Sequence, residues 1–181
     1  MLKKPPLVSD TGIVSRYGLI NRFDLLRQLY SGNIILPTEV IAECIRIPRL
    51  ESCIQDALTY KWIEEFKINY VDHPNIMLDY ARLSKRFGSG ESAVMAIAKN
   101  NGWTVGSDDM RATVKYCSKN SIPLLGSLGI LYDAYDKGFI DDIEGQAILT
   151  DMINLTDYNS PVSDFKRVID WFREGKGRRL F

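Results

Sequence analysis

Short apolar runs alternate with segments of helical periodicity along this 181-residue chain. Strands are predicted where such runs border turn residues, at 7–9, 33–36, within 62–68, 103–106 and 122–125. Helices are predicted where apolar residues recur every three or four positions, at 23–29, from 37 onward, 48–60, 80–87, 91–99, after 109, between 126 and 154, and after 161. The first strand is expected to end in a turn at Thr11-Gly12. This alternation predicts an α/β domain with a mostly parallel central sheet.

The polar break Asn159-Ser160-Pro161 is the clearest boundary signal in the chain. We therefore predict one domain over residues 1–155 and a helical C-terminal extension over 156–181, which ends in the basic stretch 173–179. No internal repeat or low-complexity segment is apparent.

Composition excludes several classes of protein. The hydrophobic content of 45% is that of a globular domain with its own core. Lys+Arg and Asp+Glu both number 23, so any basic surface must be local. The three cysteines are far apart and form no C-x-x-C pair, which argues against a disulfide framework or a zinc ribbon and for reduced, buried residues. The longest nearly apolar run, 124–132, is too short to span a bilayer and no signal peptide is apparent, so a cytoplasmic location is expected.

The single histidine, His73, excludes nucleases that use paired histidines as acid and base, and it excludes His-rich zinc sites. A Ser-His-Asp triad would need a nucleophile elbow, and no G-x-S-x-G sequence is present. Because His73 precedes a proline in a polar stretch, we expect an exposed loop residue.

Acidic residues follow two of the predicted strands. Asp10 comes directly after the first strand, and Asp108 and Asp109 follow the strand 103–106. Ligands of open parallel sheets gather beyond the carboxyl ends of the strands, so these acids are candidates for a common site. Helix capping is the competing explanation for each aspartate taken alone.

Glu43 is assessed by the geometry of its predicted helix. Val40, Ile41, Cys44 and Ile45 form an apolar stripe, and Glu43 lies at its margin. It can therefore point along the sheet edge towards the end of the first strand. Glu39, nearly opposite the stripe, is expected to face water.

Glu91 lies in the first turn of its predicted helix, where the helix dipole favours a carboxylate. A capping box from Ser89 would need Glu or Gln at position 92, which holds a serine, so Glu91 is not a box partner. Stabilisation of the helix and a role in a site both stay open for this residue.

Converging carboxylates suit Mg²⁺ or Mn²⁺, which prefer hard oxygen ligands and which would offset the repulsion between like charges. Such a site supports hydrolysis of a phosphodiester by metal-activated water. Walker and G-x-G-x-x-G sequences are absent, which argues against a nucleotide hydrolase or a dinucleotide-binding enzyme.

Four segments of the chain, in this order, resemble the motifs of PIN-domain nucleases: Ser9-Asp10-Thr11, Pro37 to Glu43, Gly90 to Ala98 and Val105 to Asp109. Two later stretches, 125–131 and 137–140, resemble stand-alone prokaryotic PIN proteins related to VapC-type toxins. The resemblance implies a three-layer α/β/α sandwich, with the C-terminal extension outside the usual compact toxin.

The resemblance also implies divalent-metal-dependent cleavage of single-stranded RNA. The acids that it assigns to catalysis are Asp10, Glu43, Glu91, Asp108 and Asp109. It implies metal ligands at Asp10, Glu43, Glu91 and one of Asp108 or Asp109, with a slight preference for Asp109, and supporting roles for Thr11 and Ser107. An antitoxin partner and a homodimer are further expectations from the same family.

Basic side chains for RNA phosphates are available near the acids. Arg111 and Lys115 follow Asp109, and Arg86 precedes Glu91. The main hypothesis is therefore a metal-dependent endoribonuclease, with a toxin role as its extension. The alternative is an inactive PIN-like module that binds RNA or a protein. An aspartyl phosphatase is disfavoured because position 12 holds glycine where a second aspartate is needed.

Overall fold

The centre of the protein is one sheet of five parallel strands, seen in a computed structural model that describes residues 4–109 and 112–175. The strands are β1 (Leu7–Ser9), β2 (Ile34–Pro37), β3 (Glu64–Phe66), β4 (Thr104–Gly106) and β5 (Leu124–Leu125). Their order in the sheet is β3-β2-β1-β4-β5, and every neighbouring pair is parallel. This confirms the predicted α/β class.

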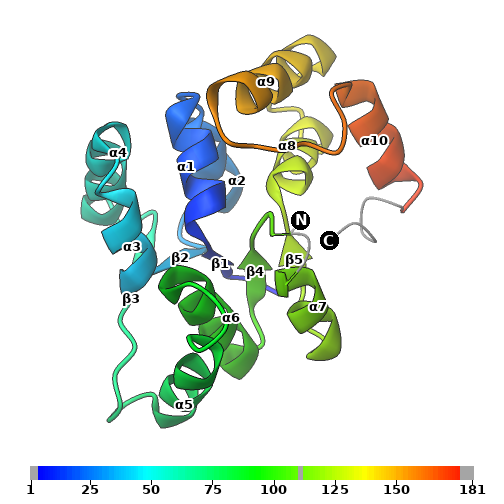
Figure 1. Ribbon diagram of the computed structural model, residues 1–181. Helices are drawn as coiled ribbons and strands as arrows, with labels where there is room; N and C mark the ends of the chain where they lie inside the picture. The colour runs from blue at the N-terminus through cyan, green and yellow to red at the C-terminus, as the bar shows by residue number, and fades with distance from the viewer. Residues whose placement is uncertain (1–3, 110–111, 176–181) are drawn as a thin grey trace.

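Helices cover both faces of the sheet, as Figure 1 shows, with α5, α6 and α7 on one side and α1, α2 and α8 on the other. The described helices are α1 (Thr11–Leu19), α2 (Phe23–Tyr30), α3 (Thr38–Cys44), α4 (Pro48–Thr59), α5 (Pro74–Leu83), α6 (Ser89–Asn101), α7 (Ala112–Lys119), α8 (Ser127–Asp136), α9 (Asp142–Leu155) and α10 (Phe165–Arg173). The fold is the three-layer α/β/α sandwich that the resemblance implied.

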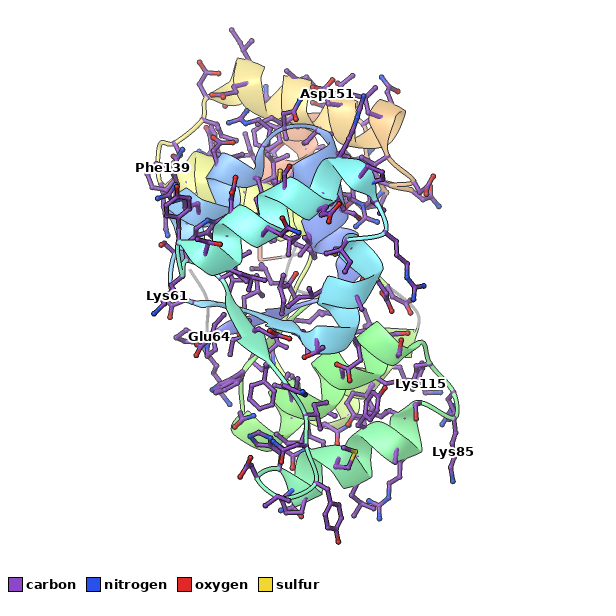
Figure 2. All side chains as sticks on the ribbon, turned by 90° about the vertical axis from the view of Figure 1, so that its left-hand side faces the viewer. Lys61, Glu64, Lys85, Lys115, Phe139 and Asp151 are labelled. Atoms are coloured by element: carbon purple, nitrogen blue, oxygen red, sulfur yellow. The ribbon has the colours of Figure 1, made fainter. Side chains whose placement is uncertain are left out.

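Burial along the strands follows their places in the sheet. The central strand β1 is entirely buried, including Leu7 and Val8, which have no exposed surface. The edge strand β3 begins with the exposed residues Glu64 and Glu65. Glu64 is labelled in Figure 2, where this edge of the sheet faces the viewer. Charged side chains on an edge strand discourage pairing with another chain.

The predicted turn at Thr11-Gly12 is wrong, because helix α1 begins at Thr11. Asp10 caps this helix, and Ile13, Val14 and Tyr17 bury one face of it. The helix has only nine residues and follows the strand with one residue between them, so the end of the strand masked the start of the helix.

The helix predicted at 80–87 is also misplaced, because α5 spans Pro74–Leu83 and begins with proline in its first turn. His73, predicted to be exposed, is half-buried instead, with its ring centroid 4.8 Å from that of Phe66. Glu39 does not simply face water either, since its Oε2 atom is buried without a hydrogen-bond partner among the described residues.

The part of the chain after residue 155 packs onto the same core. Phe165, Val168 and Ile169 of α10 are buried in the hydrophobic cluster that includes the sheet. Helix α10 contacts α8 and α9, and α9 contacts α1. The described part of the predicted extension therefore contributes helix α10, which lies beside α8 and α9 (Figure 1).

Two of the three cysteines, Cys44 and Cys117, are buried thiols, as predicted, and Cys53 is partly exposed. In the described part of the chain, no helix is both long enough and apolar enough to cross a bilayer.

Candidate active site

The carboxyl ends of the parallel strands bring the predicted acids to one edge of the sheet. Asp10 directly follows β1, and Asp108 and Asp109 follow β4, the neighbour of β1. Helix α6 returns between β3 and β4, so its N-terminal turn, with Glu91, lies at the same edge. Glu43 reaches this edge from the last turn of α3.

Asp10 is held in place by the start of its own helix. Its Oδ1 accepts a hydrogen bond of 2.9 Å from the backbone N–H of Ile13, and its side chain is also hydrogen-bonded to Ser107. Burial raises the pKa of Asp10 from 3.8 to about 6, and the nearby Asp108 adds to the rise. The hydrogen bonds and Arg16 oppose this change only in part. Asp10 therefore caps a helix and is at the same time a carboxylate short of compensating charge.

Glu43 is bound to the first turns of two helices. It accepts hydrogen bonds from the hydroxyl of Thr11, and at 3.2 Å each from the Ser89 hydroxyl and the Gly90 backbone N–H. A Cβ atom at Gly90 would lie 2.9 Å from both carboxylate oxygens of Glu43, so this position has no room for a side chain. The N-terminus of α6 favours the negative charge of the Glu43 carboxylate.

Glu91 and Asp109 lie against each other. Their side chains are hydrogen-bonded to one another, and Glu91 Oε1 also accepts a 2.6 Å hydrogen bond from the hydroxyl of Thr113. Burial raises the pKa of Glu91, Asp109 raises it further, and Thr113 lowers it. Two carboxyl groups in contact must share a proton or be bridged by a cation.

Asp108 has a different environment, because both of its oxygens are already bound. Its Oδ1 accepts a 2.7 Å hydrogen bond from the backbone N–H of Ser127, and Oδ2 accepts one of 2.5 Å from the Ser127 hydroxyl. The guanidinium of Arg16 forms an ion pair with the same Oδ2 and lies 4.4 Å from the ring centroid of Tyr158. Asp108 is thus neutralised by the protein itself.

Comparison with known families gives a match over most of the chain. A family model described as a PIN domain matches residues 6–170. The chain belongs to the PIN-domain family. A search of curated proteins gives no match to the chain. PIN domains are generally nucleases that use divalent metals, and the match extends well past the predicted boundary at residue 155.

The donor set of this PIN domain fits a divalent metal ion chemically. Asp10, Glu43, Glu91 and Asp109 offer only carboxylate oxygens, the hard donors that Mg²⁺ and Mn²⁺ prefer. The raised pKa values of Asp10 and Glu91 show that the protein alone stabilises their charges poorly. Over residues 4–109 and 112–175, however, no three His, Cys, Asp or Glu side chains converge closely enough to hold a metal ion. The acids instead lie in neighbouring groups along the edge.

Several residues of the site were not found from the sequence, namely Arg16, Ser89, Gly90, Thr113 and Ser127. Arg16 could have been suspected only if α1 had been predicted, since it lies four residues after Gly12 on the same helix face. Among the predicted RNA contacts, Arg111 lies outside the described residues, whereas Arg86 and Lys115 are exposed.

Proposed function

We propose that this PIN-domain protein is a divalent-metal-dependent endoribonuclease that hydrolyses phosphodiester bonds of single-stranded RNA. Asp10, Glu43, Glu91 and Asp109 would hold Mg²⁺ or Mn²⁺, with Thr11 and Ser107 supporting Glu43 and Asp10. The bound metal would supply an activated water and stabilise charge on the phosphate.

The contact between Glu91 and Asp109 is the observation that carries this proposal. Two carboxyl groups that touch at the edge of the sheet form an arrangement that costs stability without a cation. A purely structural role gives no reason to place them together, because a single acid suffices to stabilise a helix N-terminus.

The different contacts of the two neighbouring aspartates favour Asp109 over Asp108 as the metal ligand. Asp108 already receives the Arg16 guanidinium and two hydrogen bonds from Ser127. We assign it the role of a positioning residue, which fixes the strand end from which Asp109 reaches Glu91 and keeps a cation beside Asp10.

Cleavage of a fluorescently labelled, unstructured RNA in the presence of Mn²⁺ or Mg²⁺ tests the proposal. Asp10→Asn and Glu91→Gln are each expected to reduce cleavage to the background seen with EDTA, whereas the native chain cleaves. The matched control is Glu51→Gln, an exposed residue of α4 outside the site, which should cleave like the native chain. A DNA oligonucleotide of the same sequence tests the preference for RNA.

Undiminished cleavage by Asp10→Asn would refute the assignment of the site. The alternative, an inactive module that binds RNA or a protein, is favoured by the lack of three converging acids in the described structure. Calorimetric titration with Mn²⁺ separates the two, because an inactive module would take up no metal at millimolar concentration.

The resemblance to VapC-type toxins extends the proposal to a toxin role with an antitoxin partner. A small antitoxin-like reading frame beside the gene would support this extension, and suppression of cleavage by its product would test it directly.

A further inference from the structure

A basic pocket opens beside the acids, between the end of α5, the loop that leads into α6, and α7. Its volume is about 550 Å³. Four cations and two aromatic rings line it: Arg82, Arg86, Lys115, Lys119, Phe87 and Tyr116. Figure 2 shows the labelled Lys115 on the same side of the molecule as Lys85, which belongs to the loop after α5.

The charge of this pocket is strongly one-sided. The two remaining lining residues are a leucine and an asparagine, so no acid contributes to the wall. Asp79, which is not part of the wall, pairs with Lys99 at 2.9 Å and with the lining residue Arg82 at 3.7 Å. In the described part of the chain Arg86, Lys115 and Lys119 form no ion pair, so their charges are available to an anionic ligand.

The aromatic rings make the pocket more than a cationic patch. Phe87 and Tyr116 are half-buried and packed against the core, which fixes their rings at the wall. The guanidinium of Arg86 lies 5.7 Å from the ring centroid of Phe87. A planar base can stack on such rings and on the guanidinium, while an acidic peptide offers them no such surface.

Both walls of the pocket continue into the candidate active site. On one wall, Phe87 lies two residues before Ser89, whose hydroxyl contacts Glu43. On the other wall, Thr113 contacts Glu91, and Tyr116 and Lys119 follow it on α7 by about 4.5 Å and about 9 Å of helix rise. Both residues lie within two helical turns of Thr113, so a strand bound at the acids can extend into the pocket.

We propose that this pocket binds a nucleotide of single-stranded RNA that flanks the cleaved bond, with its base against Phe87 and Tyr116 and its phosphates on Arg86, Lys115 and Lys119. RNA as the ligand rests on the proposed function, but binding at the pocket does not depend on cleavage. The pocket thus sets where a strand lies relative to the acids.

Fluorescence anisotropy with a labelled, unstructured RNA tests the pocket in the full chain carrying Asp10→Asn, in EDTA and over a range of salt concentrations. The combined change Arg86→Ala and Lys119→Ala removes two phosphate contacts. The slope of log K against log salt concentration should become less steep by about 1.4, because each phosphate contact on a single strand contributes about 0.7 to it. The matched control, Arg27→Ala with Lys67→Ala, removes two exposed cations that do not line the pocket and should leave the salt dependence unchanged.

Stacking is tested separately at Tyr116. Tyr116→Leu should weaken binding by about 5-fold to 150-fold, whereas Tyr116→Phe keeps the ring and should bind like its parent. Circular dichroism checks that both variants fold. If Tyr116→Leu does not fold, the salt dependence of the combined Arg86→Ala and Lys119→Ala variant still decides the question.

Three results would overturn the pocket: no RNA binding by the parent chain, equal salt dependence for pocket and control variants, or displacement of RNA by poly-glutamate as effective as by unlabelled RNA. The last result would indicate an acidic protein partner instead. Failure of the proposed function gives a different result. If the chain shows no metal-dependent cleavage but the pocket variants still bind RNA more weakly, the protein is an RNA-binding module and the assignment of the pocket stands.

Discussion

Replacing Asp10 with asparagine is expected to stabilise the metal-free protein, by an amount that grows with pH. Burial raises the pKa of Asp10 from 3.8 to about 6, so the folded state prefers the protonated form. An acid of raised pKa contributes stability that is fully present below its unfolded value and is lost as pH rises through its folded value. The loss therefore occurs between about pH 4 and pH 6, which is where the native chain and the variant should diverge.

The size of this loss follows from the proton equilibrium. At about 1.4 kcal/mol per tenfold change, ionised Asp10 destabilises the fold by about 0.6 kcal/mol at pH 4, about 1.6 at pH 5 and about 3 at pH 8. Asparagine carries no charge at any of these pH values. It is also as good a helix N-cap as aspartate, so the hydrogen bond from Ile13 can persist.

Thermal unfolding in EDTA measures the effect. At pH 8 the asparagine variant should melt about 6–12 °C above the native chain, at about 2–4 °C per kcal/mol for a protein of this size. The difference should be about half as large at pH 5. Asp56→Asn, an exposed residue of α4, serves as the control without pH dependence. A variant that melts at or below the native temperature at pH 8, or a difference that is constant from pH 5 to pH 8, would refute the reasoning.

Three further predictions concern neighbouring positions. Gly90→Ala should push Glu43 aside, because the new Cβ meets its carboxylate at 2.9 Å, and cleavage should fall about 10-fold to 100-fold in the RNA assay while the protein stays folded. Asp108→Asn should lower the free energy of unfolding by about 3 kcal/mol in urea, because it removes the ion-pair partner of the largely buried Arg16 guanidinium. Asp109→Asn should mainly abolish stabilisation by Mn²⁺, and the reverse pattern would contradict the assigned roles. Gly145→Ala brings a Cβ within 2.1 Å of the Phe165 ring and should cost about 1–3 kcal/mol in the same titration, so a neutral result would show that α9 and α10 pack loosely.

The sheet and the placement of the acids could be predicted because each depends on local patterns. The buried strands 7–9 and 34–37 are apolar runs between turn residues, and parallel strands place their following residues at one edge. Glu43 was expected to point towards the first strand from its position beside the apolar stripe, and it does contact Thr11 there.

The partners of those acids could not be predicted, because they depend on contacts between distant segments. Helix α1 was hidden by the end of its strand, so nothing in the sequence aimed Arg16 at Asp108. The hydrogen bond between Glu91 and Asp109 forms only when α6 and the residues after β4 are positioned against each other. From the sequence, capping and a role in the site are competing explanations for Asp10, yet in the structure one oxygen caps α1 while the carboxyl group remains poorly compensated.

The pairing of β1 with β4 also determines when this site can exist during synthesis of the chain. Asp10 leaves the ribosome early, but its strand pairs Leu7 with Thr104, and Asp108 is bound by Ser127. At about 5–20 residues per second, several seconds of translation separate the first acid from its last neighbours. The complete set of acids assembles only after most of the polypeptide has been released from the exit tunnel, so any activity of this site is delayed until late in synthesis.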